Sequence, residues 1–514
     1  MKKRFFRGKQ RRWIDVTAAA AIAGVLAACS VTGPAGDADG DGTIDVVLAE
    51  EPNTLSTLIR SSGPVRYVSR SMVETLVARD TQGGPTLDGI VTGIAAKENS
   101  SGEYVLQLRP NVKFHDGSTL TAEDAAFSIN QVLTESTNKI FWDELTEAEA
   151  SGDLEVVVKV TNNLTAHDVL ARLSQIDALP KSYFEDVGKD GFGDSPIGTG
   201  PFKFVTWDKG LKITTERFGE YWDGTPGASG VNFTFSEDAS TRKSQVESGV
   251  ADITTAIDPQ LLNSTNGKTN VEFVQSYVNL MWQFANEGLT SDVRIRKAIS
   301  LAFAPQLIID RLLDGHGLAT FSTIPEEFTG AELDREHDVE AARRLVDEVK
   351  AEKGELPPLE LSYWSGRYAS DTDIGEATAG QIAAIGLKVQ QIPLANPQYL
   401  PKMVKSEFKG LHMTAWGQDF SSPDFALRTY ALDDSTQEYC RFLKVDDLYA
   451  SAKATTDAEE RKDYYSLIER TDLVDKVCNI PIVKLAESYV VSDNIEGFVP
   501  SYDGIIRFAD LNIS

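Results

Sequence analysis

Helical and strand-like patterns alternate along the second half of the chain, and this alternation constrains the fold more than any other feature of the sequence. The predicted helices span 291–304, 338–351, 374–385 and 397–406, and the predicted strands span 359–363, 387–392 and 411–416. Strands that alternate with helices are typical of α/β proteins, in which helices cover the faces of a sheet. We therefore expect an α/β fold.

The first half of the chain carries the same two periods. Residues 104–108 alternate between two faces, which predicts a strand. Thr121 and Asp124 form a capping box, and the apolar residues that follow at helical spacing predict a helix. A further helix is expected near 65–78. Two more strands are predicted near the C-terminus, at 480–483 and 488–491.

The N-terminus indicates export. Residues 1–28 contain a basic stretch and then a short alanine-rich apolar run, which predicts a signal peptide. The run ends in Leu-Ala-Ala-Cys29, which resembles the lipobox of bacterial lipoproteins, where the cysteine is lipidated. A signal anchor with a chance cysteine is the alternative. We expect residues 29–43 to be a lipidated flexible linker and the protein to be extracytoplasmic, anchored by lipid to the bacterial cell membrane.

The charge of the chain excludes one class of partner. The 514 residues carry a formal net charge of −27, although the first 28 residues are basic. A body this acidic is repelled by phosphate backbones, so we expect no nucleic-acid partner. The remaining two cysteines, Cys440 and Cys478, can form a disulfide in an exported protein. Two unpaired buried thiols are the alternative, because the sequence gives no distance between them.

No catalytic motif is visible in the sequence. A Gly-x-Ser-x-Gly elbow, a His-Glu-x-x-His pair and a Cys-x-x-Cys pair are all missing, and the five histidines are scattered without ligand spacing. We therefore expect no catalytic residues, no cofactor and no metal site. A large exported α/β protein without catalytic motifs is more readily explained as a binding protein than as an enzyme.

Several motifs resemble one family. They occur in the order that the family has them, at 51–55, 104–109, 114–117, 121–128, 196–203, 248–253, 293–299, 340–345, 381–389 and 416–424. Together they are similar to the family 5 extracellular solute-binding proteins, which include the oligopeptide, dipeptide and nickel receptors of ABC importers. Ala304-Pro305 departs from the acidic–basic pair that the family usually has at this helix end.

The resemblance implies a periplasmic-binding-protein-like fold of type II, in the large three-domain cluster, with two lobes around a ligand cleft. The implied domains are domain I at 44–80, 197–283 and 487–514, domain II at 81–196, and domain III at 284–486. It also implies a monomer whose lobes close by hinge motion. Its partners would be a peptide or other small solute and the permease and ATPase subunits of an importer.

The segment 412–420 is the expected ligand site. In peptide-binding members of the family, an aspartate at the position of Asp419 pairs with the α-ammonium group of the ligand. The alternative is that Asp419 caps a turn. An extended backbone at Ala415 and Gly417 can pair with a peptide as a neighbouring strand does. Trp416 and Phe420 are expected to line side-chain pockets.

Three further residues complete the hypothesis. Asn53, in the matching loop 51–55, is expected near the ligand, and Arg367 is a candidate partner for a peptide carboxylate, with a solvated loop charge as the alternative. His412 is weighed as a nickel-related residue against a buried core histidine. Peptide capture is the leading function. A nickel chelate, an oligosaccharide or an opine-like solute, and less favourably a hydrolase or a signalling receptor on the same fold, are the alternatives.

Overall fold

The computed structural model describes most of the chain beyond residue 41. The described residues are 42–58, 63–81, 83–100, 102–135, 142, 144–161, 164–264, 269–285, 287–324, 326–330, 333–368, 370–417, 423–432, 439–440, 443–455, 457–501 and 504–514. The predicted signal peptide, Cys29 and the predicted linker up to residue 41 lie outside the described residues. Among the helices of the described ranges, none is both long and apolar enough to cross a membrane.

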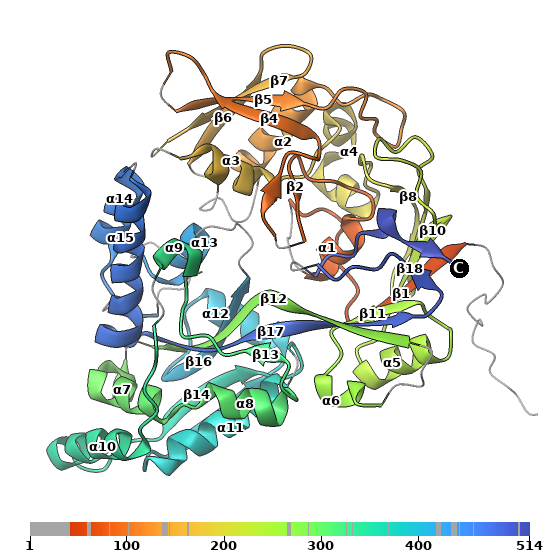
Figure 1. Cartoon of the computed structure of the whole chain (residues 1–514). Helices are drawn as coiled ribbons and strands as arrows, with labels where there is room; N and C mark the ends of the chain where they lie inside the picture. Colours follow the sequence, from red (N-terminus) through yellow and green to blue (C-terminus); the bar gives the residue numbers. More distant parts are fainter. Residues whose placement is uncertain are drawn as a thin grey trace, which may run out of the picture. The chain divides into compact units, whose positions relative to one another are not determined.

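One large mixed sheet runs through the described chain (Figure 1). In spatial order its strands are β15 (Val389–Leu394), β14 (Leu359–Trp364), β16 (Leu411–Gly417), β12 (Thr269–Phe284), β17 (Asn479–Ser492), β11 (Ile253–Thr255), β1 (Thr43–Leu48), β10 (Gly230–Phe235), β9 (Lys212–Arg217) and β8 (Phe202–Asp208), and β13 (Gly317–Leu318) pairs with β17. β1 and β14 are parallel to both of their neighbours. The predicted α/β fold class is confirmed.

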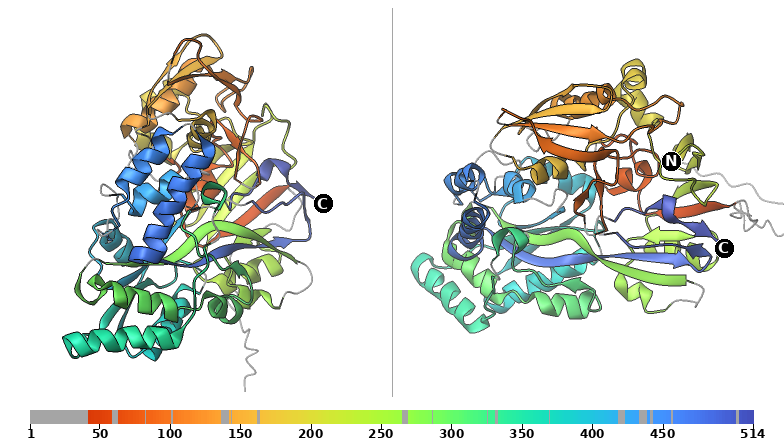
Figure 2. Two further views of the ribbon diagram at one scale, coloured as in Figure 1. Left: turned by 60° about the vertical axis from the view of Figure 1, so that its left-hand side comes forward. Right: turned by 45° about the horizontal axis from the view of Figure 1, so that its top comes forward.

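β12 and β17, hereafter the crossing pair, are the longest strands of the described chain. They lie side by side and antiparallel, from Thr269 opposite Ser492 to Gln283 opposite Asn479 (Figures 1 and 2). Residues 285–478 leave from β12, build β13 to β16, and return to β17, and we call this part the β14–β16 side. The remaining strands of the large sheet lie beyond β17. The crossing pair therefore connects the two sides of the sheet.

Helices pack the β14–β16 side into two cores. The first core contains residues of α7 (Val293–Ala302), α8 (Pro305–Leu312), α10 (Val339–Lys353), α11 (Asp371–Ala384) and α12 (Asn396–Val404), together with Leu280, Trp282 and Phe284 of β12. These three alternate residues have no exposed surface, as the period of a strand requires. The second core contains residues of α13 (Pro423–Tyr430), α14 (Asp446–Ala454) and α15 (Ala458–Arg470).

A disulfide lies in the second core. It joins Cys440, between α13 and α14, to Cys478, the residue directly before β17, with the two Cα atoms 5.6 Å apart. The bond therefore ties the helices of the second core to the beginning of one strand of the crossing pair.

A second, antiparallel sheet forms what we call the four-stranded module. Its strands are β4 (Val91–Ala96), β5 (Glu103–Leu108), β7 (Glu155–Val160) and β6 (Leu145–Ala150), and its helices are α2 (Ala122–Glu135), α3 (Ala166–Leu173) and α4 (Lys181–Asp194). The capping box predicted before α2 is confirmed, because the Thr121 backbone N–H donates to Asp124 Oδ2 at 2.9 Å and the Asp124 N–H donates to Thr121 Oγ1 at 3.3 Å. The module shares one hydrophobic core with β1 and β10.

Two local predictions differ from the structure. The helix expected over 65–78 ends early, as α1 (Gly63–Ser69), and residues 78–79 belong to β2 (Ala78–Arg79). Beyond this helix the carbonyl of Met72 accepts the N–H of Gly200, and the N–H of Leu76 donates to the carbonyl of Ile176, so tertiary hydrogen bonds take the place of the helical ones that these groups would form. The two strands predicted at 480–483 and 488–491 form the single strand β17.

The described chain also contains short strands and α-helices. They are β3 (Pro85–Thr86), α5 (Ala239–Glu247), α6 (Pro259–Leu262), α9 (Glu326–Thr329), β18 (Ile495–Glu496) and β19 (Asn512–Ile513).

Candidate functional site

The end of β16 carries three of the predicted ligand-binding residues, Ala415, Trp416 and Gly417. Along one edge this segment pairs antiparallel with residues 278–280 of β12. Along the other edge, β14 pairs with β16 only at the first two residues of β16. In the part of the chain that the structure describes, no strand covers this second edge at 415–417. Alternate residues of a strand direct their N–H and C=O groups to such an edge, where another extended chain can pair with them.

The first four residues of β16 anchor the strand. Leu411, His412, Met413 and Thr414 have no exposed surface. The ring of His412 packs against the rings of Phe408 and Tyr439, with centroids 5.2 and 4.0 Å apart. Burial lowers the pKa of His412 to about 3, because the charged imidazole would lose its hydration. His412 is therefore an uncharged core residue, which matches the buried alternative rather than the nickel-related one.

Arg367 lies in the loop after β14, where contacts with neighbouring residues hold it. Asp371, at the start of α11, accepts the Arg367 backbone N–H at 2.7 Å, and Asn396 Oδ1 accepts Arg367 Nη1 at 2.6 Å. The guanidinium also lies over the ring of Trp364, 5.0 Å from its centroid. Arg367 is exposed, so its remaining N–H groups stay accessible to solvent or to a carboxylate.

The other predicted site residues are less informative. Asp419 and Phe420 lie outside the described residues, and for Trp416 the structure describes the backbone alone. Asn53 is exposed in the loop after β1. The described contacts bring neither Asn53 nor Arg367 to the free edge of β16, so only the segment 415–417 forms a continuous candidate surface.

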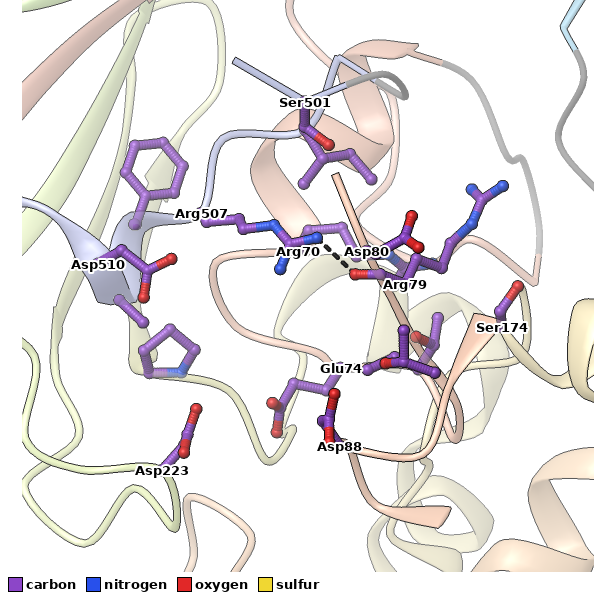
Figure 3. Close-up of a pocket in the computed structure, with 18 of the residues that line it drawn as sticks. Arg70, Glu74, Arg79, Asp80, Asp88, Ser174, Asp223, Ser501, Arg507 and Asp510 are labelled. Atoms are coloured by element: carbon purple, nitrogen blue, oxygen red, sulfur yellow. Dashed lines mark hydrogen bonds between the residues drawn. The ribbon is translucent and has the colours of Figure 1, made fainter. Parts of the chain in front are cut away.

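A cavity of about 520 Å³ lies elsewhere, and the sequence did not indicate it. It is bounded by α1 and the chain that follows it, the β2–β3 hairpin, the segments 174–175, 221–223 and 505–510, and Ser501 (Figure 3). Its charged lining residues include Glu74, Asp88, Asp223 and Asp510, and the arginines Arg70, Arg79 and Arg507. None of the predicted ligand-binding residues lines this cavity.

Glu74 is the most enclosed acid of this cavity. Its carboxylate accepts hydrogen bonds from Thr199 Oγ1 at 2.7 Å, Tyr221 OH at 2.9 Å and Trp222 Nε1 at 2.8 Å. Burial raises the pKa of Glu74 to about 7 despite these three donors, and the negative charge of Asp223 adds to the rise. An acid inside an apolar run, here Met-Val-Glu-Thr-Leu-Val, is the sequence signal that could have marked this position.

The remaining charges of the cavity differ in how they are satisfied. Arg70 is paired with buried Asp177, so its charge is already neutralised. The carboxylates of Asp88, Asp223 and Asp510 form no hydrogen bond or ion pair with any described residue. Arg507 donates through Nη2 to the carbonyl of Arg79. Its other N–H groups can donate to a ligand. Such a hollow can accommodate a small solute that carries both an ammonium and a carboxylate group.

Metal binding finds no support in the described ranges. Within them, no group of three or more His, Cys, Asp or Glu side chains is arranged to hold a metal ion. The residues of the candidate surface and of the cavity are suited to non-covalent binding of a solute.

Comparison with known proteins identifies one family and several similar chains. The model of the bacterial extracellular solute-binding proteins, family 5 middle, matches residues 89–438. Among curated proteins, Protein XP55 of Streptomyces lividans is 26% identical over 519 residues, which cover 95% of this chain and 93% of that protein.

Two solved structures have a similar fold. NikA from Brucella suis in complex with Fe(III)-EDTA aligns with a TM-score of 0.81 and 19% identity, over 92% of this chain and 100% of that one. The oligopeptide-binding protein AppA from Bacillus subtilis, in complex with a nonapeptide, aligns with a TM-score of 0.77 and 18% identity, over 92% of this chain and 99% of that one. At these identities the comparison establishes the fold but not the ligand.

Proposed function

Because the chain belongs to the bacterial extracellular solute-binding proteins of family 5, we propose that it captures peptides outside the cytoplasm and delivers them to the permease of an ABC importer. It is a solute-binding receptor rather than an enzyme, since its relatives are binding proteins of transporters. Two parts of this statement are proposals: that the solute is a peptide, and that the chain delivers it to a permease.

The free edge of β16 is the observation that supports peptides. A peptide added beside 415–417 would gain main-chain hydrogen bonds that do not depend on its side chains. Such bonds give affinity without reading the sequence, which suits a receptor that takes many peptides. A sugar or a metal chelate has no extended backbone, so it cannot pair with this edge as a neighbouring strand does.

Asp419 is the proposed anchor for the α-ammonium group of the peptide. In the sequence it comes two residues after Gly417, the last residue of the free edge. A carboxylate in a site that excludes water is costly unless a cation pairs with it, and a free amino terminus supplies that cation with strong hydrogen bonds. Trp416 and Phe420 are proposed to line side-chain pockets, and Arg367 and Asn53 to contact the ligand from their loops.

The alternatives remain a nickel chelate, an oligosaccharide or an opine-like solute. NikA, with its Fe(III)-EDTA, has the same fold, so the fold does not exclude a chelate. Against a chelate stands the burial of His412, and against a neutral sugar stands the charge of Asp419.

We also propose the architecture that accompanies this function. Domain I would comprise 44–80, 197–283 and 487–514, domain II 81–196, and domain III 284–486. The crossing pair supports the boundary near 283–284, because β12 ends at Phe284. A monomer tethered through lipid on Cys29, after removal of residues 1–28, would present its ligand to the permease and ATPase subunits.

Calorimetry tests peptide capture with a matched pair of probes. We expect trialanine to bind and N-acetyl-trialanine, which lacks the ammonium group, to bind far more weakly. Asp419→Asn should weaken trialanine by about 2–5 kcal/mol, the usual effect of removing one member of a buried charge pair. Equal affinity for the two probes would exclude the anchor, and a sugar that co-purifies and is identified by native mass spectrometry would contradict peptide capture.

Lipid anchoring has its own test. Cys29→Ala should release the protein from the membrane fraction of expressing cells, and immunoblots of membrane and soluble fractions measure the change. Retention of Cys29→Ala in the membrane would contradict the lipid anchor while leaving peptide capture intact.

A further inference from the structure

Glu144 joins charges from two separate parts of the molecule. It stands directly before β6 in the four-stranded module. One carboxylate oxygen, Oε2, accepts Nη2 of Arg172, on α3 of the same module. The other, Oε1, lies 3.2 Å from Nζ of Lys453, on α14 of the β14–β16 side. The exposed fractions of the three side chains are 2% for Glu144, 3% for Arg172 and 12% for Lys453.

The two parts that meet at Glu144 have separate hydrophobic cores. Leu145 of β6 and Leu170 of α3 belong to the core that the module shares with β1. Tyr449 and Ala452 of α14 belong to the second core of the β14–β16 side. The chain that connects the two parts passes through the crossing pair (Figure 1). The contact at Glu144 therefore joins two parts with separate hydrophobic cores.

A change in the angle between these bodies would affect the two ion pairs differently. The Arg172–Glu144 pair lies within the module and would persist. The Lys453–Glu144 pair spans both bodies and would break. We propose that the Lys453–Glu144 ion pair is a latch, which holds α14 against the four-stranded module and opens when the β14–β16 side swings away.

The chemistry of the pair suits a contact that opens and closes. Desolvation of an ammonium group offsets much of the attraction that it gains from a carboxylate, so a partly buried pair is close to balance. When the latch opens, Glu144 keeps Arg172, so the most deeply buried charge of the contact is not left without a partner. A contact of large apolar side chains would expose them to water on opening and would hold the bodies more permanently.

Distances between two spin labels test the latch without any ligand. The labels sit at two exposed positions, Ser151→Cys on the module and Glu459→Cys on α15, in the full chain with Cys29→Ser. Cys440 and Cys478 are joined to each other and do not take the label. Double electron–electron resonance then measures the distribution of distances between the two bodies.

We expect Lys453→Met to raise the fraction of long distances several-fold, and Lys453→Arg to restore the parent distribution. Lys388→Met is the matched control, because Lys388 forms an exposed ion pair with Glu355 on the same side of the sheet. Should Lys453→Met fold poorly in a thermal melt, Lys453→Gln replaces it. The latch is overturned if the Lys453 variant keeps the parent distribution, or if the Lys388 control shifts it as much.

Discussion

The crossing pair and the Lys453–Glu144 contact both connect the β14–β16 side to other parts of the described chain, and they do so by different interactions. The crossing pair uses main-chain hydrogen bonds along two long strands and buries Trp282 completely. The Lys453–Glu144 contact uses one ion pair between side chains. The first joins segments within one sheet, and the second joins bodies with separate cores.

This difference indicates which connection can move. Main-chain pairs of a sheet break only when the sheet unfolds, whereas an ion pair exchanges its partner for water at small net cost. The crossing pair should therefore act as a hinge that stays paired while it bends. Its register shifts between Gln275 and Asn279 and between Leu280 and Met281 mark places where the pairing is already irregular.

The largest effect is expected for Trp282→Ala, in β12. The side chain has no exposed surface and belongs to the first core of the β14–β16 side. Its removal leaves a cavity and should lower the free energy of unfolding by about 3–5 kcal/mol. Urea denaturation measures the loss, with Leu211→Ala, at a side chain 66% exposed, as the control that should change little. A loss below about 1 kcal/mol would show that the crossing pair contributes little to the fold.

The disulfide should have the next largest effect. Replacement of Cys440 and Cys478 by serine removes a bond that closes a loop of 38 residues. The unfolded chain regains the freedom of that loop, so the free energy of unfolding should fall by about 2–4 kcal/mol. Denaturation of the double variant without reductant measures it. An unchanged midpoint would mean that packing alone holds the second core against β17.

The pH dependence of stability should reveal Glu487, a half-buried acid of β17. Burial raises its pKa to about 7, the N–H of Ala256 and the charge of Arg242 only partly oppose the rise, and its Oε1 has no hydrogen-bond partner among the described residues. The folded state therefore holds a proton that the unfolded state releases near pH 4.5. Stability from this group is complete below pH 4.5 and is lost as the pH rises to about 7.

Glu487→Gln isolates this contribution, because the amide keeps the shape and cannot ionise. Between pH 4.5 and 7 the free energy of unfolding should fall by up to about 3 kcal/mol more in the parent protein than in the variant. This figure is the free energy that corresponds to the rise in the pKa of Glu487 on folding. Urea denaturation at intervals of half a pH unit measures both. Parallel curves for the parent and the variant would contradict a neutral Glu487 at the crossing pair.

The sequence predicts best the elements whose patterns are local. The strand at 411–416 is predictable because Leu411 and Met413 alternate with His412 and Thr414, and the structure extends it by one residue. The helix predicted at 65–78 is wrong because its end depends on Gly200, which is distant in the sequence and takes the carbonyl of Met72. Local patterns therefore locate most strands and helices, and tertiary hydrogen bonds decide where some of them end.

The candidate surface and the cavity differ in the same way. The free edge at 415–417 belongs to one continuous segment, so a motif in the amino-acid sequence is enough to mark it. The cavity brings Glu74 together with Asp223 and Asp510, which come from three segments far apart in the chain. The contact of Lys453 with Glu144 is equally invisible, because no sequence pattern pairs one lysine with one of 77 acidic residues.

The smallest effect on global stability is expected for Lys453→Met, although this variant should change the distances between the two bodies most. Opening of the latch leaves both cores and the crossing pair intact, and Glu144 keeps Arg172. The free energy of unfolding should therefore fall by about 1 kcal/mol, well below the ~3–5 kcal/mol expected when a buried charge loses its only partner. Urea denaturation of the Lys453→Met and Trp282→Ala variants under the same conditions compares the two losses of stability. A loss as large as that of Trp282→Ala would place Lys453 within the cooperative unit of the fold, and the contact would then be a permanent brace rather than a latch.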